Sequence, residues 1–149
     1  MQGGEQVNVD CGYSWTELDM KPGDKARFDG FCGISASFDA VAEASLPGKL
    51  PDGYTFGSGY TESVVGAANG IIPNGGTAEL SLVVPEGKTP VVFYWDAGAS
   101  KWVEVPMAGS EGSFSASDAG MQVLSGVSLS GGMAHFTVNF TGTFIVVYK

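Results

Sequence analysis

Apolar residues occupy every second position in several short stretches of the chain. The segment 133–140 has this pattern, and an apolar run over 143–148 follows it after a Thr-Gly break. A period of two predicts β-strands with one buried face, and a short break between two such strands favours an antiparallel hairpin. The same alternation recurs at 77–84 and 121–129. Strands are therefore predicted for most of the molecule.

Glycine-rich turns separate the predicted strands at short intervals. The 23 glycines and the low proportion of charged residues, 15%, fit short strands joined by tight turns better than long solvated helices. Beyond the turn-rich connector 46–53, the predicted strands are 54–56, 59–65, 77–84, 90–95, 101–105, 120–129, 133–140 and 143–148. Many short antiparallel strands predict an all-β antiparallel β-sandwich, Ig-like or jelly-roll-like.

The 149 residues suit one domain, with main sandwich strands at 50–149 and N-terminal strands and loops at 1–49. In the N-terminal part we expect strands at 5–9, 25–28 and 34–42. A helical turn over 38–46 is the alternative there, because alanine and glutamate favour helices.

An excess of acidic residues restricts the choice of partners. Sixteen acidic and 7 basic residues give a net charge of -9, which repels the phosphates of nucleic acid and anionic lipid headgroups. No apolar stretch approaches the roughly 18 residues of a membrane span. We expect an extracellular or cell-surface location, with Met1 either an introduced start or the start of an excised segment whose export signal lies outside this sequence.

The N-terminal part carries both cysteines and a group of aspartates. A disulfide between Cys11 and Cys32 would close a loop of about twenty residues and contribute about 3 kcal/mol; two separate buried thiols are the alternative. Aspartate oxygens are ligands that calcium prefers. The candidates for a structural calcium site are Asp10, Asp19, Asp24 and Asp29. Their alternative role is turn formation and capping, and no other cofactor is expected.

Catalytic chemistry has few candidates in the sequence. Glu62, Glu79 and Glu104 fall in predicted strands and would suit a glycosidase only if two of them converged. His135 is the one histidine and is expected on the face opposite Phe136. There is no Gly-x-Ser-x-Gly elbow, so the prediction is a protein that is not an enzyme.

From residue 50 onward the chain resembles Ig-like or related β-sandwich modules of bacterial secreted and cell-surface proteins. The resemblance is carried by the segments TAELSLVVP at 77–85, VVFYWD at 91–96, KWVEVP at 101–106 and GTFIVV at 142–147. It implies a hairpin formed by the second and third of these segments. It also implies display, adhesion or spacing on a cell surface, and it transfers no catalytic residue.

Two functional hypotheses follow. The first is a non-catalytic extracellular module for display, adhesion or assembly, with other surface-protein domains or copies of itself as partners and with 5–9 as a strand that can be donated. The alternative is a carbohydrate-binding module that stacks polysaccharide on exposed aromatic rings, with structural calcium. Its candidate ligand-binding residues are Trp15, Tyr94 and Trp102. Trp95 is expected in the core, because it shares a strand face with Val91 and Phe93.

Overall fold

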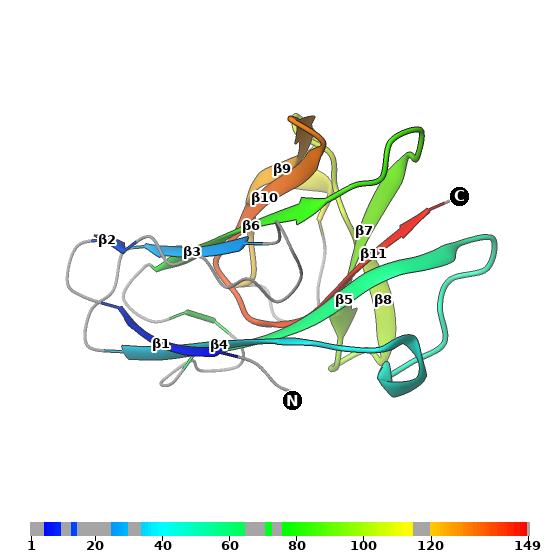
Figure 1. Ribbon diagram of the computed structural model, residues 1–149. Coiled ribbons are helices and arrows are strands. Elements are labelled where there is room, and N and C mark those ends of the chain that lie inside the picture. The colour runs from blue at the N-terminus through cyan, green and yellow to red at the C-terminus, as the bar shows by residue number, and fades with distance from the viewer. Residues whose placement is uncertain are drawn as a thin grey trace.

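The protein is an all-β structure of two antiparallel sheets, which confirms the all-β, antiparallel part of the predicted fold class. The computed structural model describes residues 5–9, 13–14, 25–29, 34–64, 71–72, 76–114 and 120–148. The two sheets face each other, and the N-terminal strands extend them to one side (Figure 1).

Every pair of neighbouring strands in both sheets is antiparallel. In spatial order, the first sheet consists of β1 (Glu5–Val9), β4 (Ile34–Ala40), β5 (Thr55–Val64), β11 (Gly142–Tyr148), β7 (Pro90–Asp96) and β8 (Lys101–Val105). The second sheet consists of β2 (Tyr13–Ser14), β3 (Lys25–Asp29), β6 (Thr77–Val83), β10 (Met133–Val138) and β9 (Val123–Ser130). Two 3-10 turns, η1 (Glu43–Ser45) and η3 (Glu111–Ser113), lie in the connections.

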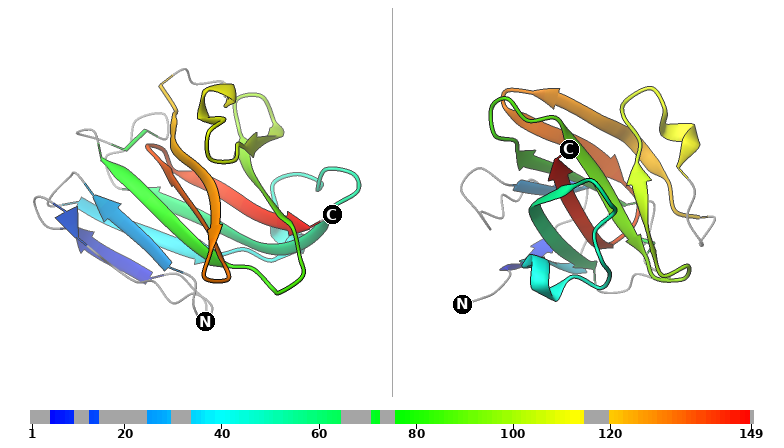
Figure 2. Two further views of the ribbon diagram at one scale, coloured as in Figure 1. Left: turned by 90° about the horizontal axis from the view of Figure 1, so that it is seen from above. Right: turned by 90° about the vertical axis from the view of Figure 1, so that its right-hand side faces the viewer.

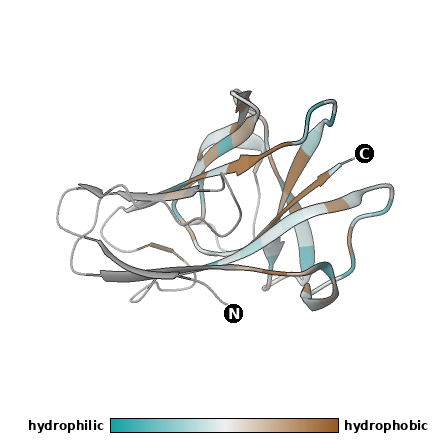
Figure 3. Cartoon of the chain, viewed as in Figure 1, coloured by the Kyte–Doolittle hydropathy of each residue, from teal (hydrophilic) through white to brown (hydrophobic). Residues whose placement is uncertain are grey.

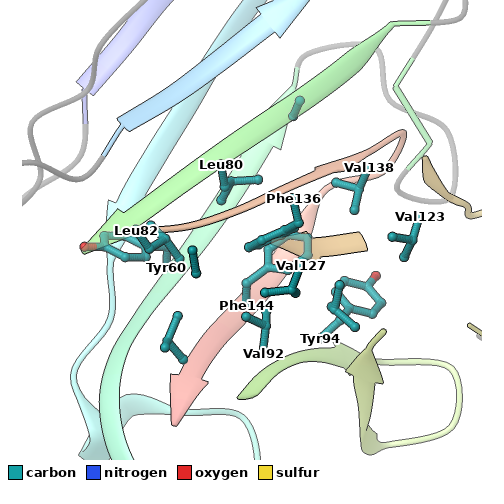
Figure 4. Packing of buried hydrophobic residues seen from close by; sticks show 14 of the residues in the cluster. Tyr60, Leu80, Leu82, Val92, Tyr94, Val123, Val127, Phe136, Val138 and Phe144 are labelled. Carbon is teal, nitrogen blue, oxygen red and sulfur yellow. The ribbon is translucent and has the colours of Figure 1, made fainter. Parts of the chain in front are cut away.

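The main hydrophobic core fills the space between the sheets. Alternate residues of β6 and β10 point into it, so Leu80, Leu82 and Phe136 are almost fully buried. From the opposite sheet, Tyr60 and Phe144 pack toward them (Figure 4). Figure 3 shows apolar residues concentrated on β6, β7 and β11, the strands nearest this core. The period-two pattern therefore identified the buried faces of β6 and β10 correctly, whereas in β9 the burial does not alternate and Leu124 and Leu129 are exposed.

A second, smaller cluster covers the outer face of the first sheet. Ile145 and Val147 of β11 point away from the main core and are fully buried. They pack, together with Phe93, against residues of the covering loop (residues 41–54) such as Leu46 and Leu50. Figure 2 shows this loop, in teal, beside the end of β11. Because both faces of β11 are buried, its sequence is continuously apolar rather than alternating.

The predicted hairpin between 133–140 and 143–148 is wrong. β10 pairs with β6 and β9 in the second sheet, whereas β11 pairs with β5 and β7 in the first. The chain crosses between the sheets at Thr141, where Phe140 is buried in the main core and packs on Phe144. Gly142 has a φ of 142°, and a Cβ there would lie 2.7 Å from the ring of Tyr94. The Thr-Gly break thus marks a crossing between sheets.

The N-terminal and central expectations agree with the structure, with small changes in bounds. The expected edge strand 5–9 is β1, and the expected strands 54–56 and 59–65 form one long strand, β5. Strand and helix alternatives for 34–46 are both partly realised, because β4 ends at Ala40 and η1 follows at Glu43–Ser45. The hairpin of β7 and β8 is confirmed.

One side of the molecule is closed by a short seam between the two sheets. Met107 forms a parallel bridge with Val127 of β9. At this seam Gly126 lies so close to the chain that a Cβ would be 2.5 Å from the carbonyl oxygen of Met107. The Glu111 carboxylate accepts hydrogen bonds from the backbone N–H of Gly126 at 2.8 Å and of Gly109 at 3.0 Å. Glu111 therefore holds η3 against β9.

Replacing Glu111 with glutamine should weaken the seam in a pH-dependent way. The N–H groups of Gly126 and Gly109 stabilise the ionised carboxylate and lower the pKa of Glu111. A carboxyl with a lowered pKa stabilises the fold above its unfolded pKa and loses this effect as pH falls through the folded value. Glu111→Gln should therefore lower Tm at pH 7, and the difference from the unaltered protein should shrink toward pH 3.

Thermal unfolding followed by circular dichroism at several pH values measures this difference. Glu86→Gln, at an exposed turn position, is the matched control and should leave Tm unchanged. A Tm deficit of Glu111→Gln that is the same at every pH would show that the charge of Glu111 is not what holds the seam.

Candidate functional site

Two tryptophans form a rigid pair on the β7–β8 hairpin. Trp95 and Trp102 are directly opposite each other, with ring centroids 5.0 Å apart and planes inclined by 67°. The indole N–H of Trp102 donates a hydrogen bond to the carbonyl oxygen of Lys49 at 2.9 Å. Gly48 lies against the ring of Trp95, and a Cβ would overlap it. The covering loop is thus fastened onto the pair.

Both tryptophans are half-buried. Trp102 belongs to the cluster on the outer face of the first sheet, and Trp95 shares that strand face with Phe93, as expected from the sequence. The expectation that Trp95 lies in the core is therefore only partly met. Each residue keeps some exposed surface, as a site that stacks a sugar requires.

Tyr94 is placed differently from Trp102. Its side chain is 5% exposed, and its ring packs on Phe140 and Phe144 in the main core. Its hydroxyl donates a hydrogen bond to the carbonyl oxygen of Thr141 at 3.3 Å. Tyr94 therefore stabilises the crossing between the sheets, and its ring has no open face on which a sugar could stack.

Most of the N-terminal candidates fall outside the described residues. This applies to Trp15, to both cysteines of the predicted disulfide, Cys11 and Cys32, and to the calcium candidates Asp10, Asp19 and Asp24. Asp29 is the last residue of β3, where it pairs with Thr77 of β6. Among the described residues, no group of three or more His, Cys, Asp or Glu side chains could hold a metal ion. The disulfide and the calcium site stay predictions.

The three glutamates considered for hydrolysis lie in different environments. Glu62 points into the space between the sheets, Glu104 is exposed on β8, and Glu79 lies on β6 opposite the core-facing side of that strand. A pair of carboxylates acting on one glycosidic bond must face a common cleft. These three glutamates do not form such a pair.

Glu62 is the most unusual side chain of the described structure, and sequence reasoning missed its burial. It is 1% exposed, and neither carboxyl oxygen has a hydrogen-bond partner among the described residues. Burial raises its pKa from 4.5 to about 8, so the group is mostly protonated at neutral pH. The signal was present in the sequence, because alternation places Glu62 on the same strand face as the buried Tyr60.

His135 forms a local contact on the outer face of the second sheet. It is half-buried and lies on the side of β10 opposite Phe136, as predicted. Its Nδ1 is 2.8 Å from Oγ of Ser81, and its Nε2 is 3.4 Å from the carbonyl oxygen of Ser130. These contacts give both ring nitrogens of His135 a partner on a neighbouring strand. They supply neither a carboxylate to orient the histidine nor donors for an oxyanion, which nucleophilic catalysis would need.

Two surface hollows lie beside the first sheet, one in the covering loop and one next to β8. A hollow of 340 Å³ lies within the covering loop, between Leu46, Lys49 and Tyr54. Another, of 420 Å³, runs beside β8 and is lined by Val103, Glu104, Pro106, Met107, Ser110 and Ser113. The second is the larger of these two, and Val103 and Glu104 of β8 line it.

Comparisons with protein-family models, curated proteins and solved structures found no match. Within the described ranges, no helix has the length and apolar character needed to cross a membrane. The function must therefore be argued from the geometry itself.

The buried carboxyl of Glu62 should make stability depend on pH in the direction opposite to Glu111. In the unfolded chain Glu62 loses its proton near pH 4.5, whereas in the folded protein it keeps the proton up to about pH 8. The folded state binds more protons between these values, so stability falls by about 1.4 kcal/mol per pH unit as pH rises through this window. Glu62→Gln, which cannot ionise, should remove this slope.

Urea unfolding at pH 5, 6, 7 and 8 measures the slope, with Glu79→Gln as a control on a half-buried glutamate. The control should keep the slope of the unaltered protein. If Glu62→Gln and the unaltered protein have parallel pH profiles, Glu62 is ionised or solvated in the folded state.

Proposed function

We propose that the protein is a non-catalytic display, adhesion or assembly module of a bacterial surface or secreted protein, built as an Ig-like or related β-sandwich. The observation that carries the proposal is the position of β1. Among the described strands, it forms one edge of the six-stranded first sheet. An edge strand is well suited to exchange between copies or between neighbouring domains.

The pairing of β1 supports this role. Five residues of β1 pair with β4, from Glu5 opposite Phe38 to Val9 opposite Ile34. Among the described strands, β1 borders β4 alone in the sheet order. The same backbone pairing along β4 can be made by β1 of another copy, so exchange of the strand conserves these pairs.

The net charge and the predicted disulfide support the part of the proposal that concerns secretion and protein partners. The net charge of -9 keeps copies soluble and unattractive to nucleic acid. The predicted Cys11–Cys32 disulfide would connect the chain on either side of β2 and β3 in an oxidising compartment. The partners we propose are other surface-protein domains or copies of this chain.

Deleting residues 1–10 should change the oligomeric mass if β1 is donated between copies. The truncated protein lacks the donor strand, so it should be monomeric under conditions in which the full chain associates. Light scattering coupled to size-exclusion chromatography measures the mass. Deletion of residues 1–4 is the matched control, because it keeps β1 (Glu5–Val9), and it should behave like the full chain.

An unchanged mass after deletion of residues 1–10 would rule out donation of β1. Addition of a synthetic peptide of residues 1–10 to the truncated protein provides a second readout. The peptide should bind with one copy per chain, since it can restore the pairing with β4.

The second candidate function is carbohydrate binding at Trp102, with Trp95 in place of Tyr94 as the neighbouring ring. The favouring observation is the fixed, half-exposed tryptophan pair, because aromatic rings held rigidly lose little entropy on binding. Under this proposal a polysaccharide should quench tryptophan fluorescence saturably. Trp102→Ala should abolish this quenching, and a cooperative thermal transition should show that the variant is still folded.

A panel of glycans tested with calcium and then with EDTA separates the two functions. Trp102→Phe is the control variant, since it keeps one aromatic ring at the site while it loses the second ring of the indole and the N–H that donates to the carbonyl oxygen of Lys49. Equal fluorescence traces for all glycans and for buffer would exclude the tryptophan pair as a sugar site.

A further inference from the structure

The edge of the first sheet opposite β1 is also open along part of its length. β8 is the last strand in the sheet order and pairs with β7 along one side, from Val105 opposite Val92 to Lys101 opposite Asp96. The hydrogen bonds to β9 begin at Pro106, beyond the end of β8. No strand of the described residues lies along the outer side of Lys101–Val105.

The hydrogen bonds at the seam identify which backbone groups point toward this open edge. The Pro106 carbonyl oxygen accepts from the N–H of Val127, and the N–H of Ala108 donates to the Val127 carbonyl oxygen, both at 2.9 Å. In a strand, the N–H and C=O of alternate residues point to the same side. Trp102 and Glu104, which alternate with Pro106, therefore direct their backbone groups outward. Pro106 has no N–H and sits where an edge tolerates proline.

A groove runs alongside these backbone groups. It has a volume of 420 Å³ and lies between β8 and the segment that contains η3. Its apolar surface comes from Val103, which is half-buried, and Met107, which is 44% exposed. Figure 2 shows η3, in yellow, beside β9 and next to β8. An added strand would thus have backbone partners on one side and side-chain contacts on the other.

The far wall of the groove is held in place before any ligand arrives. Glu111 binds the backbone of Gly109 and Gly126, and the Ser113 hydroxyl donates to the Ser110 carbonyl oxygen at 2.8 Å. A preformed groove spares the ligand the entropic cost of ordering its binding site.

Charge decides which class of occupant fits. Glu104 is exposed on the rim of the groove, and the whole chain carries a charge of -9. Lys101 is the one basic residue of β8 and lies at its other end, beside the turn. The carboxylate of Glu104 therefore favours a basic segment over an acidic one at this edge.

We propose that the open edge of β8 binds an extended, basic peptide segment of a partner protein as an additional antiparallel strand of the first sheet. The backbone groups of Trp102 and Glu104 pair with the segment, Val103 and Met107 contact its apolar side chains, and Glu104 contacts its basic ones. This inference deepens the proposed assembly role by naming a partner and a second edge, and it does not require donation of β1.

The experiment uses fluorescein-labelled peptides of alternating composition, Lys-Val-Lys-Thr-Lys-Val and its counterpart with glutamate in place of lysine. Fluorescence anisotropy should show saturable binding of the lysine peptide and none of the glutamate peptide. Glu104→Pro removes the outward N–H and should weaken binding at least tenfold. Glu104→Gln keeps that N–H and is the matched control. It should lose only part of the affinity and bind with a weaker salt dependence.

Hydrogen exchange supplies the structural readout, because the amide protons of Trp102 and Glu104 should become protected when the lysine peptide binds. Ser113→Arg, at an exposed position that lines the groove, is a second blocking variant if Glu104→Pro does not fold. The variant lacking residues 1–10 should bind the peptide like the full chain, which separates failure of this inference from failure of β1 donation.

Three results would overturn the proposal. Equal binding by folded Glu104→Pro and Glu104→Gln would indicate adsorption by charge alone. Protection confined to amides outside β8 would place the peptide elsewhere. Loss of self-association in Glu104→Pro, without peptide binding by the unaltered protein, would make a second copy the occupant.

Discussion

The burial of β11 on both faces is the constraint on which the rest of the structure depends. Phe144 and Val146 face the main core, while Ile145 and Val147 face the opposite way, and all four are fully buried. Each such side chain contributes about 1.5–3 kcal/mol when removed from water. The first pair requires the second sheet, and the second pair requires the covering loop (residues 41–54). The contacts of Gly48 and Lys49 with the tryptophan pair fasten this loop over Ile145 and Val147.

Strand positions and their buried faces were readable from the sequence because they depend on local alternation. Leu80, Leu82 and Phe136 lie in the core as the period of two predicts. The Thr141-Gly142 break was misread because a short break has the same appearance whether the chain reverses within a sheet or crosses to another one. The difference lies in distant contacts, chiefly those of Phe140 with Phe144 and of Tyr94 with Thr141. Local patterns carry no information about such pairings.

Candidate binding residues were harder to predict because residue type alone does not determine burial. Tyr94 and Trp102 are both aromatic residues of one hairpin, yet the first belongs to the core and the second keeps an exposed part. Alternation separates them, since they occupy opposite strand faces, but which face is covered depends on the covering loop. Glu62 shows the reverse case. Its strand face was readable, but its polarity argued against the burial that the neighbouring Tyr60 imposes. Its protonation at neutral pH is the physical consequence.

The two edges of the first sheet, β1 and β8, must meet different physical demands in the proposed roles. Among the described strands, β1 pairs with β4 along one side and forms one edge of the sheet. β8 is fixed on three sides: by its hairpin with β7, by Trp102 bound to Lys49, and by the seam that starts at Pro106. A strand that is to be exchanged must dissociate at low cost, whereas an edge that receives a strand must keep its backbone groups in place. Under the two proposals, β1 is the edge that donates a strand and β8 is the edge that receives one. The exposed carboxylate of Glu104 is the reason for proposing a basic segment at β8.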